Sequence, residues 1–254
     1  MAHFHIPKPL HGWREFVGEV GIIVLGVLIA LGFEQVVVQW RWRQEVGTTR
    51  QALANELAEA TNQGAERIAV EDCLRDRIGQ LAAKLKESTG RWTADPEPLA
   101  PGAKSTPHWD NRGIGRVYSV PLRGWSQDAW DTAKSNGVLD HMNHEEVASY
   151  SAVYAEIAGI RDFQNQELLL ESNLSFLSAD QRLDGRSRND ALGTLGKLDA
   201  LNAVTTGLSS LMIDQLKGLH LQMDRAARSE EIKRAIADER QYRGSCVKDV
   251  KIEF

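Results

Sequence analysis

The sequence lacks the short motifs by which most active sites are recognised. It contains no Walker-type phosphate loop, no nucleophile elbow, no zinc-protease helix and no Cys-x-x-Cys pair. His141 and His144 lie close to acidic residues, but Asn143 between them has the character of a helix cap, so one continuous helix would not present both rings. We therefore predict no metal site and no cofactor. The sequence favours a non-enzymatic protein, and an enzyme whose site has no recognisable motif is the alternative.

An excess of positive charge is also missing. The 254 residues include 30 Lys and Arg against 35 Asp and Glu, which gives a formal net charge of -5. Neutralising the phosphates of a nucleic acid requires a clustered surplus of basic side chains. A nucleic-acid partner is therefore not expected.

Cysteine is scarce, with two residues in the whole chain. Cys73 lies near the start of the polar part of the sequence and Cys246 lies near its end. A disulfide between them would tie these two ends together, and structural disulfides are typical of oxidising compartments. The alternative is two unrelated buried thiols.

Proline is absent after Pro121, and most of the prolines before it fall between residues 96 and 121. We therefore predict a long loop over residues 88–124 and long helices beyond it. A loop of this length usually has a task. Its aromatic and guanidinium groups suggest a surface for a ligand or a partner, formed by Trp109, Arg112, Arg116 and Trp125. Alternatively, the tryptophans fix the loop onto the helices.

Long apolar runs are absent except for one near the N-terminus, which covers residues 16–38 with an acidic residue close to each end. About 23 residues form roughly 34 Å of helix, which suffices for a hydrocarbon core of roughly 30 Å. We predict a short tail at residues 1–15, a transmembrane anchor at residues 16–42 and a soluble domain at residues 43–254.

Three features bear on how this segment would cross a membrane. Trp13 and Trp40 bracket it about 40 Å apart along a helix, which matches the aromatic belts of the two headgroup layers. A cleaved signal peptide is disfavoured because no small-residue cleavage site follows the run. The flanking positive charges are nearly balanced, so they do not set the orientation of the span. The two cysteines favour an orientation that places the soluble domain in an oxidising compartment, where a disulfide between them would persist. We expect a single-pass protein of the bacterial inner membrane with a periplasmic C-terminal domain.

One face of the predicted span, which we call the anchor face, carries both small residues and acidic residues. At 100° per residue, its four members fall within about 80° of one another; they are Glu19, Gly26, Ala30 and Glu34. Small residues let two membrane helices approach closely, and a carboxylate inside a membrane needs a partner or access to the headgroups. The anchor face therefore predicts contact with a second copy or with another membrane protein. The alternative is a lone helix whose acids mark the two interfaces.

Apolar residues recur at helical spacing through most of the polar part of the chain. The pattern predicts a helix from residue 43 to about residue 85, with a local unwinding or kink at residues 67–70 where the register slips. The pattern fits two alternatives for this segment, a coiled-coil stalk or the first helix of an intramolecular bundle. The pattern then predicts a short helix after Ser126 and a helix opened by Asn143. A last helix over residues 190–240 follows, and the chain ends in a short strand or an extended tail. The fold class is all-α, an antiparallel helical bundle.

Residues 19–35 contain the run Ile-Val-Leu-Gly-Val-Leu-Ile-Ala-Leu, followed by Glu-Gln and then Trp40. This block resembles the N-terminal anchor of uncharacterised single-span membrane proteins of Gram-negative bacteria. The resemblance implies an inner-membrane anchor that carries a helical domain. We therefore expect a membrane-anchored interaction or scaffold protein with the lipid bilayer as one partner. The alternative is an extracytoplasmic, sensor-like ligand-binding module that acts with a separate partner.

Overall fold

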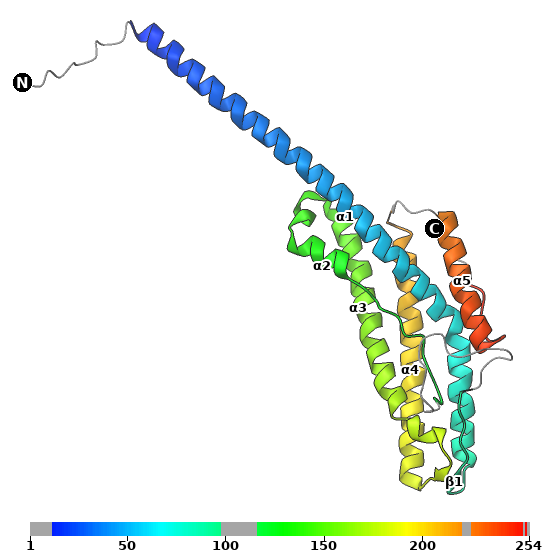
Figure 1. The fold of residues 1–254 in the computed structure, drawn as a ribbon. Helices are drawn as coiled ribbons and strands as arrows, with labels where there is room; N and C mark the ends of the chain where they lie inside the picture. The colour runs from blue at the N-terminus through cyan, green and yellow to red at the C-terminus, as the bar shows by residue number, and fades with distance from the viewer. Residues whose placement is uncertain (1–11, 98–115, 220–224, 251, 253–254) are drawn as a thin grey trace, which may run out of the picture. The chain divides into compact units, whose positions relative to one another are not determined.

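The chain is all-α, as predicted (Figure 1). The computed structural model describes residues 12–97, 116–219, 225–250 and 252. Its helices are α1 (Gly12–Glu87), α2 (Asp128–Ser135), α3 (His144–Ser172), α4 (Gly185–Leu216) and α5 (Arg225–Arg243). Two short 3-10 helices, Val138–His141 and Ser175–Ser178, flank α3. The strands β1 (Arg91–Trp92) and β2 (Gln181–Arg182) pair antiparallel, with Arg91 opposite Arg182.

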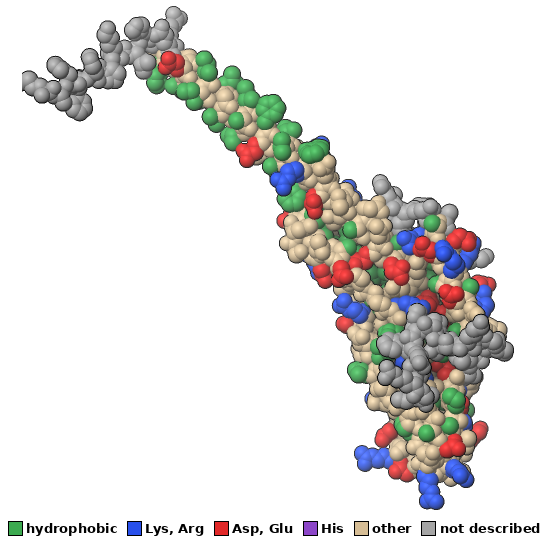
Figure 2. All heavy atoms as spheres, in the orientation of Figure 1, with side chains coloured by type: hydrophobic (Ala, Val, Ile, Leu, Met, Phe, Trp, Pro, Cys, Tyr) green, Lys and Arg blue, Asp and Glu red, His purple; other side chains and the backbone are tan. Residues whose placement is uncertain are grey.

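The chain divides into two compact units, residues 1–48 and residues 49–254. The described part of the first unit is the beginning of α1, whose large apolar side chains between Trp13 and Trp40 are 39% to 77% exposed. In a globular helix such side chains would face a core. Here they are exposed at successive positions all around the helix, and Figure 2 shows those on the face toward the viewer. This segment of α1 is long and apolar enough to cross a membrane.

In the second unit, α1 and α3 run in the same direction and α4 runs against both. Successive α1 residues Arg50, Glu56 and Arg67 bond to successive α3 residues, namely Glu146, Tyr154 and Glu167. Residues 116–127 carry the chain back along α1, from Val117 beside Arg77 to Ser126 beside Glu56, and this return makes the parallel arrangement of α1 and α3 possible. The antiparallel packing that the sequence suggested therefore holds for α4 but not for the pair α1 and α3.

The helix cap that the sequence predicted at Asn143 is present, and α2 also ends at a local signal. Asn143 caps α3, and its side-chain oxygen accepts the backbone N–H groups of Glu145 and Glu146. Asn136 ends α2, and Gly137 follows with a φ of 74°, a conformation that favours glycine. The terminal residues 245–250 form no strand.

The predicted helix over residues 190–240 is wrong, because two helices occupy this region. The backbone N–H groups of Lys217 and Gly218 bond to carbonyls three residues back, which tightens and ends α4. Leu219, which continues the apolar pattern, is buried in the core instead of extending the helix. α5 then runs parallel to α1, because Asn62 bonds to Glu231 near the start of α5 and Ala69 bonds to Lys248 after its end.

The sequence predicted a local unwinding or a kink at residues 67–70, and the unwinding is wrong. α1 is helical throughout this stretch, although its axis bends within the second unit (Figure 1). The apolar register slips because Arg67 occupies a core position there and is 3% exposed. The shift in the spacing of apolar residues is therefore explained by a buried charge that has a partner on another helix. It does not mark a break in α1.

Two apolar clusters form the core of the second unit. The Trp130 cluster joins α1 residues 53–60, α3 residues 150–160, α4 residues 212–216 and Leu219 around Trp130, which stacks on Tyr154 at 5.1 Å between ring centroids. The Trp92 cluster joins α1 residues 65–85 and α4 residues 191–198 with Trp92, parts of the loop and α5. On α3 and α4, buried polar residues separate the two clusters, and on α1 the buried Arg67, which lies just past Ala65, bonds to them.

These separating residues form a polar layer, defined here as Arg67, Gln164, Glu167, Asn202 and Thr205, each at most 5% exposed. Arg67 Nη2 donates to Glu167 Oε1 and, at 3.1 Å, to Asn202 Oδ1. Asn202 Nδ2 donates in turn to the carbonyl of Glu71. Burial raises the pKa of Glu167, while the charge of Arg67 acts in the opposite direction. Because an unpaired buried charge is costly, the layer fixes the register of α1 against α3 and α4.

Replacing Arg67 by methionine (Arg67→Met) should destabilise the second unit by about 3 to 5 kcal/mol, because it leaves the Glu167 carboxylate buried without its cation. The double variant Arg67→Met/Glu167→Met should lose much less, since no charge then remains buried. The measurement is urea unfolding of the full chain in detergent, followed by tryptophan fluorescence. An Arg67→Met variant as stable as the parent would refute the role given to the polar layer.

Candidate functional site

The first candidate is the anchor face. Glu19, Gly26, Ala30 and Glu34 all lie at exposed helical positions of α1, and acidic side chains lie near both ends of the apolar segment (Figure 2). A Cβ atom added at Gly26 would meet no atom within 4 Å. The face is therefore open in the chain by itself, and it can accept lipid or a helix of another molecule.

The second candidate was the loop. Trp109 and Arg112 lie outside the described residues. Arg116 and Trp125 contact different parts of α3: Arg116 Nη1 lies 3.3 Å from Glu171 Oε1, whereas Trp125 is buried and donates its indole N–H to Gln164 Oε1 at 3.1 Å. These two residues serve as contacts between the loop and the helices.

The other described aromatic residues of the loop point inward as well. Trp92 is 1% exposed and donates its indole N–H to the carbonyl of Leu177 at 2.6 Å. Tyr118 is fully buried in the Trp92 cluster. Over its described residues, the loop therefore uses its aromatic side chains for packing, which is the structural alternative that the sequence had left open.

Buried ion pairs hold the same loop against α1 and α5. Arg123 donates from Nε to Glu66 Oε2 at 2.5 Å, and its Nη2 lies 3.8 Å from Glu239 Oε1. Arg243 Nε bonds to Glu239 at 2.8 Å, and Arg243 Nη1 bonds to Glu97 at 3.0 Å. One chain of alternating charges thus links α1, both described ends of the loop and α5.

Two buried carboxylates in this region have strongly raised pKa values. Burial raises the pKa of Glu66 to about 7, against the opposing hydrogen bond from Arg123. Burial likewise raises the pKa of Glu171 to about 7, against the attraction of Arg116. A carboxyl group with a raised folded-state pKa contributes stability that is present at acidic pH and is lost as the pH rises through that pKa. These two acids therefore favour the folded bundle more at mildly acidic than at alkaline pH.

The two cysteines form a disulfide. Cys73 on α1 and Cys246 after α5 are bonded, with their Cα atoms 5.1 Å apart and 173 positions apart in sequence. α5 runs parallel to α1 and so brings Cys246, which follows it, to Cys73 on α1. In the chain-entropy model, closing a loop of this length stabilises by roughly 5 kcal/mol.

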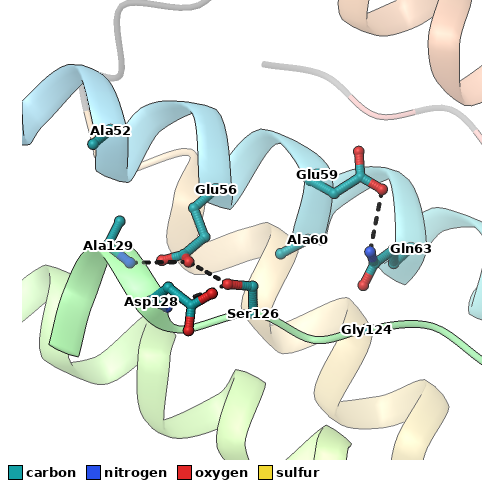
Figure 3. A pocket seen from close by; sticks show the side chains of 9 residues that line it. All are labelled: Ala52, Glu56, Glu59, Ala60, Gln63, Gly124, Ser126, Asp128 and Ala129. Atoms are coloured by element: carbon teal, nitrogen blue, oxygen red, sulfur yellow. Dashed lines mark hydrogen bonds between the residues drawn. The ribbon is translucent and has the colours of Figure 1, made fainter. Parts of the chain in front are cut away.

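One pocket of about 340 Å³ opens between α1 and the segment that leads into α2 (Figure 3). Its lining residues are Ala52, Glu56, Glu59, Ala60, Gln63, Gly124, Ser126, Asp128 and Ala129. Sequence reasoning missed it, because it joins residues some 70 positions apart. The one local signal was the helical spacing of acids and alanines along residues 52–63.

The two histidines considered in the sequence lie in different helical elements. His141 ends the 3-10 helix before α3, and His144 is the first residue of α3 beyond the cap. Over the described residues, no group of three or more His, Cys, Asp or Glu side chains could hold a metal ion.

The chain matches no family model, and no curated protein or solved structure is significantly similar to it. Its function must therefore be argued from its own residues.

Proposed function

We propose that the protein is a single-pass, membrane-anchored helical interaction or scaffold protein. The observation that carries this proposal is the apolar segment of α1, whose large side chains are exposed on every side. In water, exposure of so much apolar surface would cost roughly 25 cal/mol for each Å². A hydrocarbon environment removes that cost, and the resemblance of residues 19–35 to inner-membrane anchors supports the same environment.

The anchor face is the proposed contact with a partner, either a second copy or another membrane protein. A helix that only tethers a domain needs no small residues near its middle and no carboxylates within its apolar run. Gly26 and Ala30 would allow close approach of a second helix, and Glu19 and Glu34 would then find hydrogen-bond donors or headgroups at its two ends.

A ligand-binding module that acts with a separate partner is the second candidate. The loop supports it less than the sequence suggested, because Arg116 and Trp125 are engaged by α3. The pocket beside Gly124 is the observation that favours it.

Photocrosslinking tests the proposed contact. A photoreactive amino acid introduced at Ile23 lies on the anchor face, whereas one at Leu28 lies on the opposite face, counting 100° per residue. Expressed in bacterial membranes, the chain labelled at Ile23 should form a discrete crosslinked species, and the chain labelled at Leu28 should form little. The variant Gly26→Leu/Ala30→Leu should lose most of that species, because leucine side chains prevent close helix approach.

The matched control is Gly21→Leu/Gly32→Leu, which adds two leucine side chains, and slightly more volume, on the opposite face and should leave the crosslink unchanged. Equal crosslinking from both faces, or full crosslinking in the Gly26→Leu/Ala30→Leu variant, would remove the anchor face as a contact.

A periplasmic location of the second unit is part of the proposal, and the disulfide supports it because such bonds persist in oxidising compartments. In a Cys73→Ser/Cys246→Ser background, the exposed residue Asp199 is changed by Asp199→Cys to give a single thiol. A membrane-impermeant maleimide should label this thiol in intact spheroplasts as fully as after permeabilisation. Labelling only after permeabilisation would place the second unit in the cytoplasm and contradict the proposed orientation.

A further inference from the structure

The ion pairs that join α1, the loop and α5 form one connected series, which we call the charge chain: Glu66, Arg123, Glu239, Arg243 and Glu97. Arg123 bonds to Glu66 on α1 and lies 3.8 Å from Glu239 on α5. Arg243 bonds to Glu239 at 2.8 Å and to Glu97 at 3.0 Å. The charges alternate in sign, and a carboxylate stands at each end. With three carboxylates against two guanidinium groups, the charge chain has one negative charge in excess when every acid is ionised.

The charge chain lies largely out of water. The side chains of Glu66, Glu239 and Glu97 are 3%, 8% and 9% exposed, and that of Arg243 is 6% exposed. A buried ionised group without its own counter-ion is costly, and a carboxyl group avoids this cost by binding a proton. One proton on one of the three acids balances the charge chain.

The acid at the loop end of the charge chain is well stabilised in its ionised form. Glu97 accepts three side-chain hydrogen bonds, from Ser119, from Tyr242 at 3.5 Å and from Arg243 at 3.0 Å. Hydrogen bonds to the ionised form favour that form. The excess charge therefore falls on the other end of the charge chain.

Glu66, at this other end, has the weaker support for a negative charge. Arg123 is its one cationic partner in the described part of the chain, and Glu66 shares it with Glu239. Burial and the nearby Glu239 carboxylate raise the pKa of Glu66 to about 7, against the opposing hydrogen bond from Arg123. Glu59 on α1 also acts on Arg123, and α3 contributes the uncharged Gln164, whose amide bonds to the backbone of Arg123.

The attachment of α5 depends on this balance, because few apolar side chains hold the helix. The buried residues of its described part follow a helical spacing; they are Ile232, Ile236, Glu239 and Tyr242. A carboxylate thus occupies the buried face of α5, near the acid on α1. A second negative charge on Glu66 would repel it across a poorly hydrated contact.

We propose that Glu66 and Glu239 share one proton and that this proton latches α5 onto α1. A neutral Glu66 has an O–H group that can donate to the ionised Glu239. When the proton leaves for the solvent, the two carboxylates repel each other and α5 separates from α1. The disulfide between Cys73 and Cys246 keeps α5 tethered, so the opening is reversible. This inference goes beyond the proposed function and does not depend on membrane anchoring.

The direction of the pH effect follows from the burial of Glu66. Its carboxyl group binds the proton more tightly in the closed form than in the open form, where its pKa returns toward the ordinary value of 4.5. Opening therefore becomes more favourable by up to about tenfold for each pH unit between about pH 4.5 and pH 7, and it levels off at higher pH.

Hydrogen–deuterium exchange of the full chain in detergent, followed by mass spectrometry of peptides from residues 228–242, measures this opening. After correction for the intrinsic exchange rate at each pH, protection of α5 should fall by at least about tenfold between pH 5.5 and pH 8. In the variant Glu66→Gln, protection at pH 8 should stay close to its value at pH 5.5, because the glutamine amide can donate to Glu239 at every pH.

The matched control is Glu59→Gln, which removes an exposed carboxylate from the same helix and should keep the pH dependence of the parent chain. Residues 198–209 of α4 are the internal reference and should lose much less protection than α5. A parent chain whose α5 protection does not change with pH overturns the proposal, and this result requires no variant to fold. The proposal is also overturned if Glu66→Gln keeps the fall in protection, or if α4 loses as much protection as α5, because the pH effect would then be global.

Discussion

The ion pair between Arg67 and Glu167 is the constraint on which the second unit depends. Both side chains are almost completely buried, and such charges are tolerated only when they meet with good geometry. α1 and α3 can therefore pack in only one register, and Asn202 extends the requirement to α4. The Trp130 cluster and the Trp92 cluster lie on the two sides of this layer. Apolar packing supplies the bulk of the stabilisation, and the polar layer makes the arrangement unique.

The loop and α5 satisfy a second set of buried charges. Arg123 and Arg243 each join two segments that are far apart in sequence, and the disulfide after α5 closes the same side of the unit. Aromatic residues of the loop fill the core beneath these pairs. The described part of the loop thus joins α1, α3 and α5. Among the described residues, the pocket beside Gly124 and the anchor face are two surfaces open to other molecules.

Features with a local cause could be predicted from the sequence. The apolar segment of α1, the cap at Asn143 and the stop at Asn136 and Gly137 each depend on a few neighbouring residues. The end of α4 was missed because the apolar pattern continues through Leu219, and only tertiary packing turns that residue inward. The parallel direction of α3 and the partners of Arg67 and Arg123 depend on contacts between distant segments, and a single sequence contains no signal for them. The pocket was missed for the same reason.

The proposed role of the protein requires that α1 cross a membrane, because a hydrocarbon environment removes the cost of exposing the apolar segment and brings the anchor face to other membrane helices. Alkaline carbonate extraction of membranes from cells that express the full chain measures this most directly. The parent chain should stay in the membrane pellet, and the variant Leu25→Arg/Leu28→Arg should be extracted, since each arginine in mid-span costs about 2.5 to 3.5 kcal/mol of insertion. Extraction of the parent chain into the soluble fraction would contradict the account.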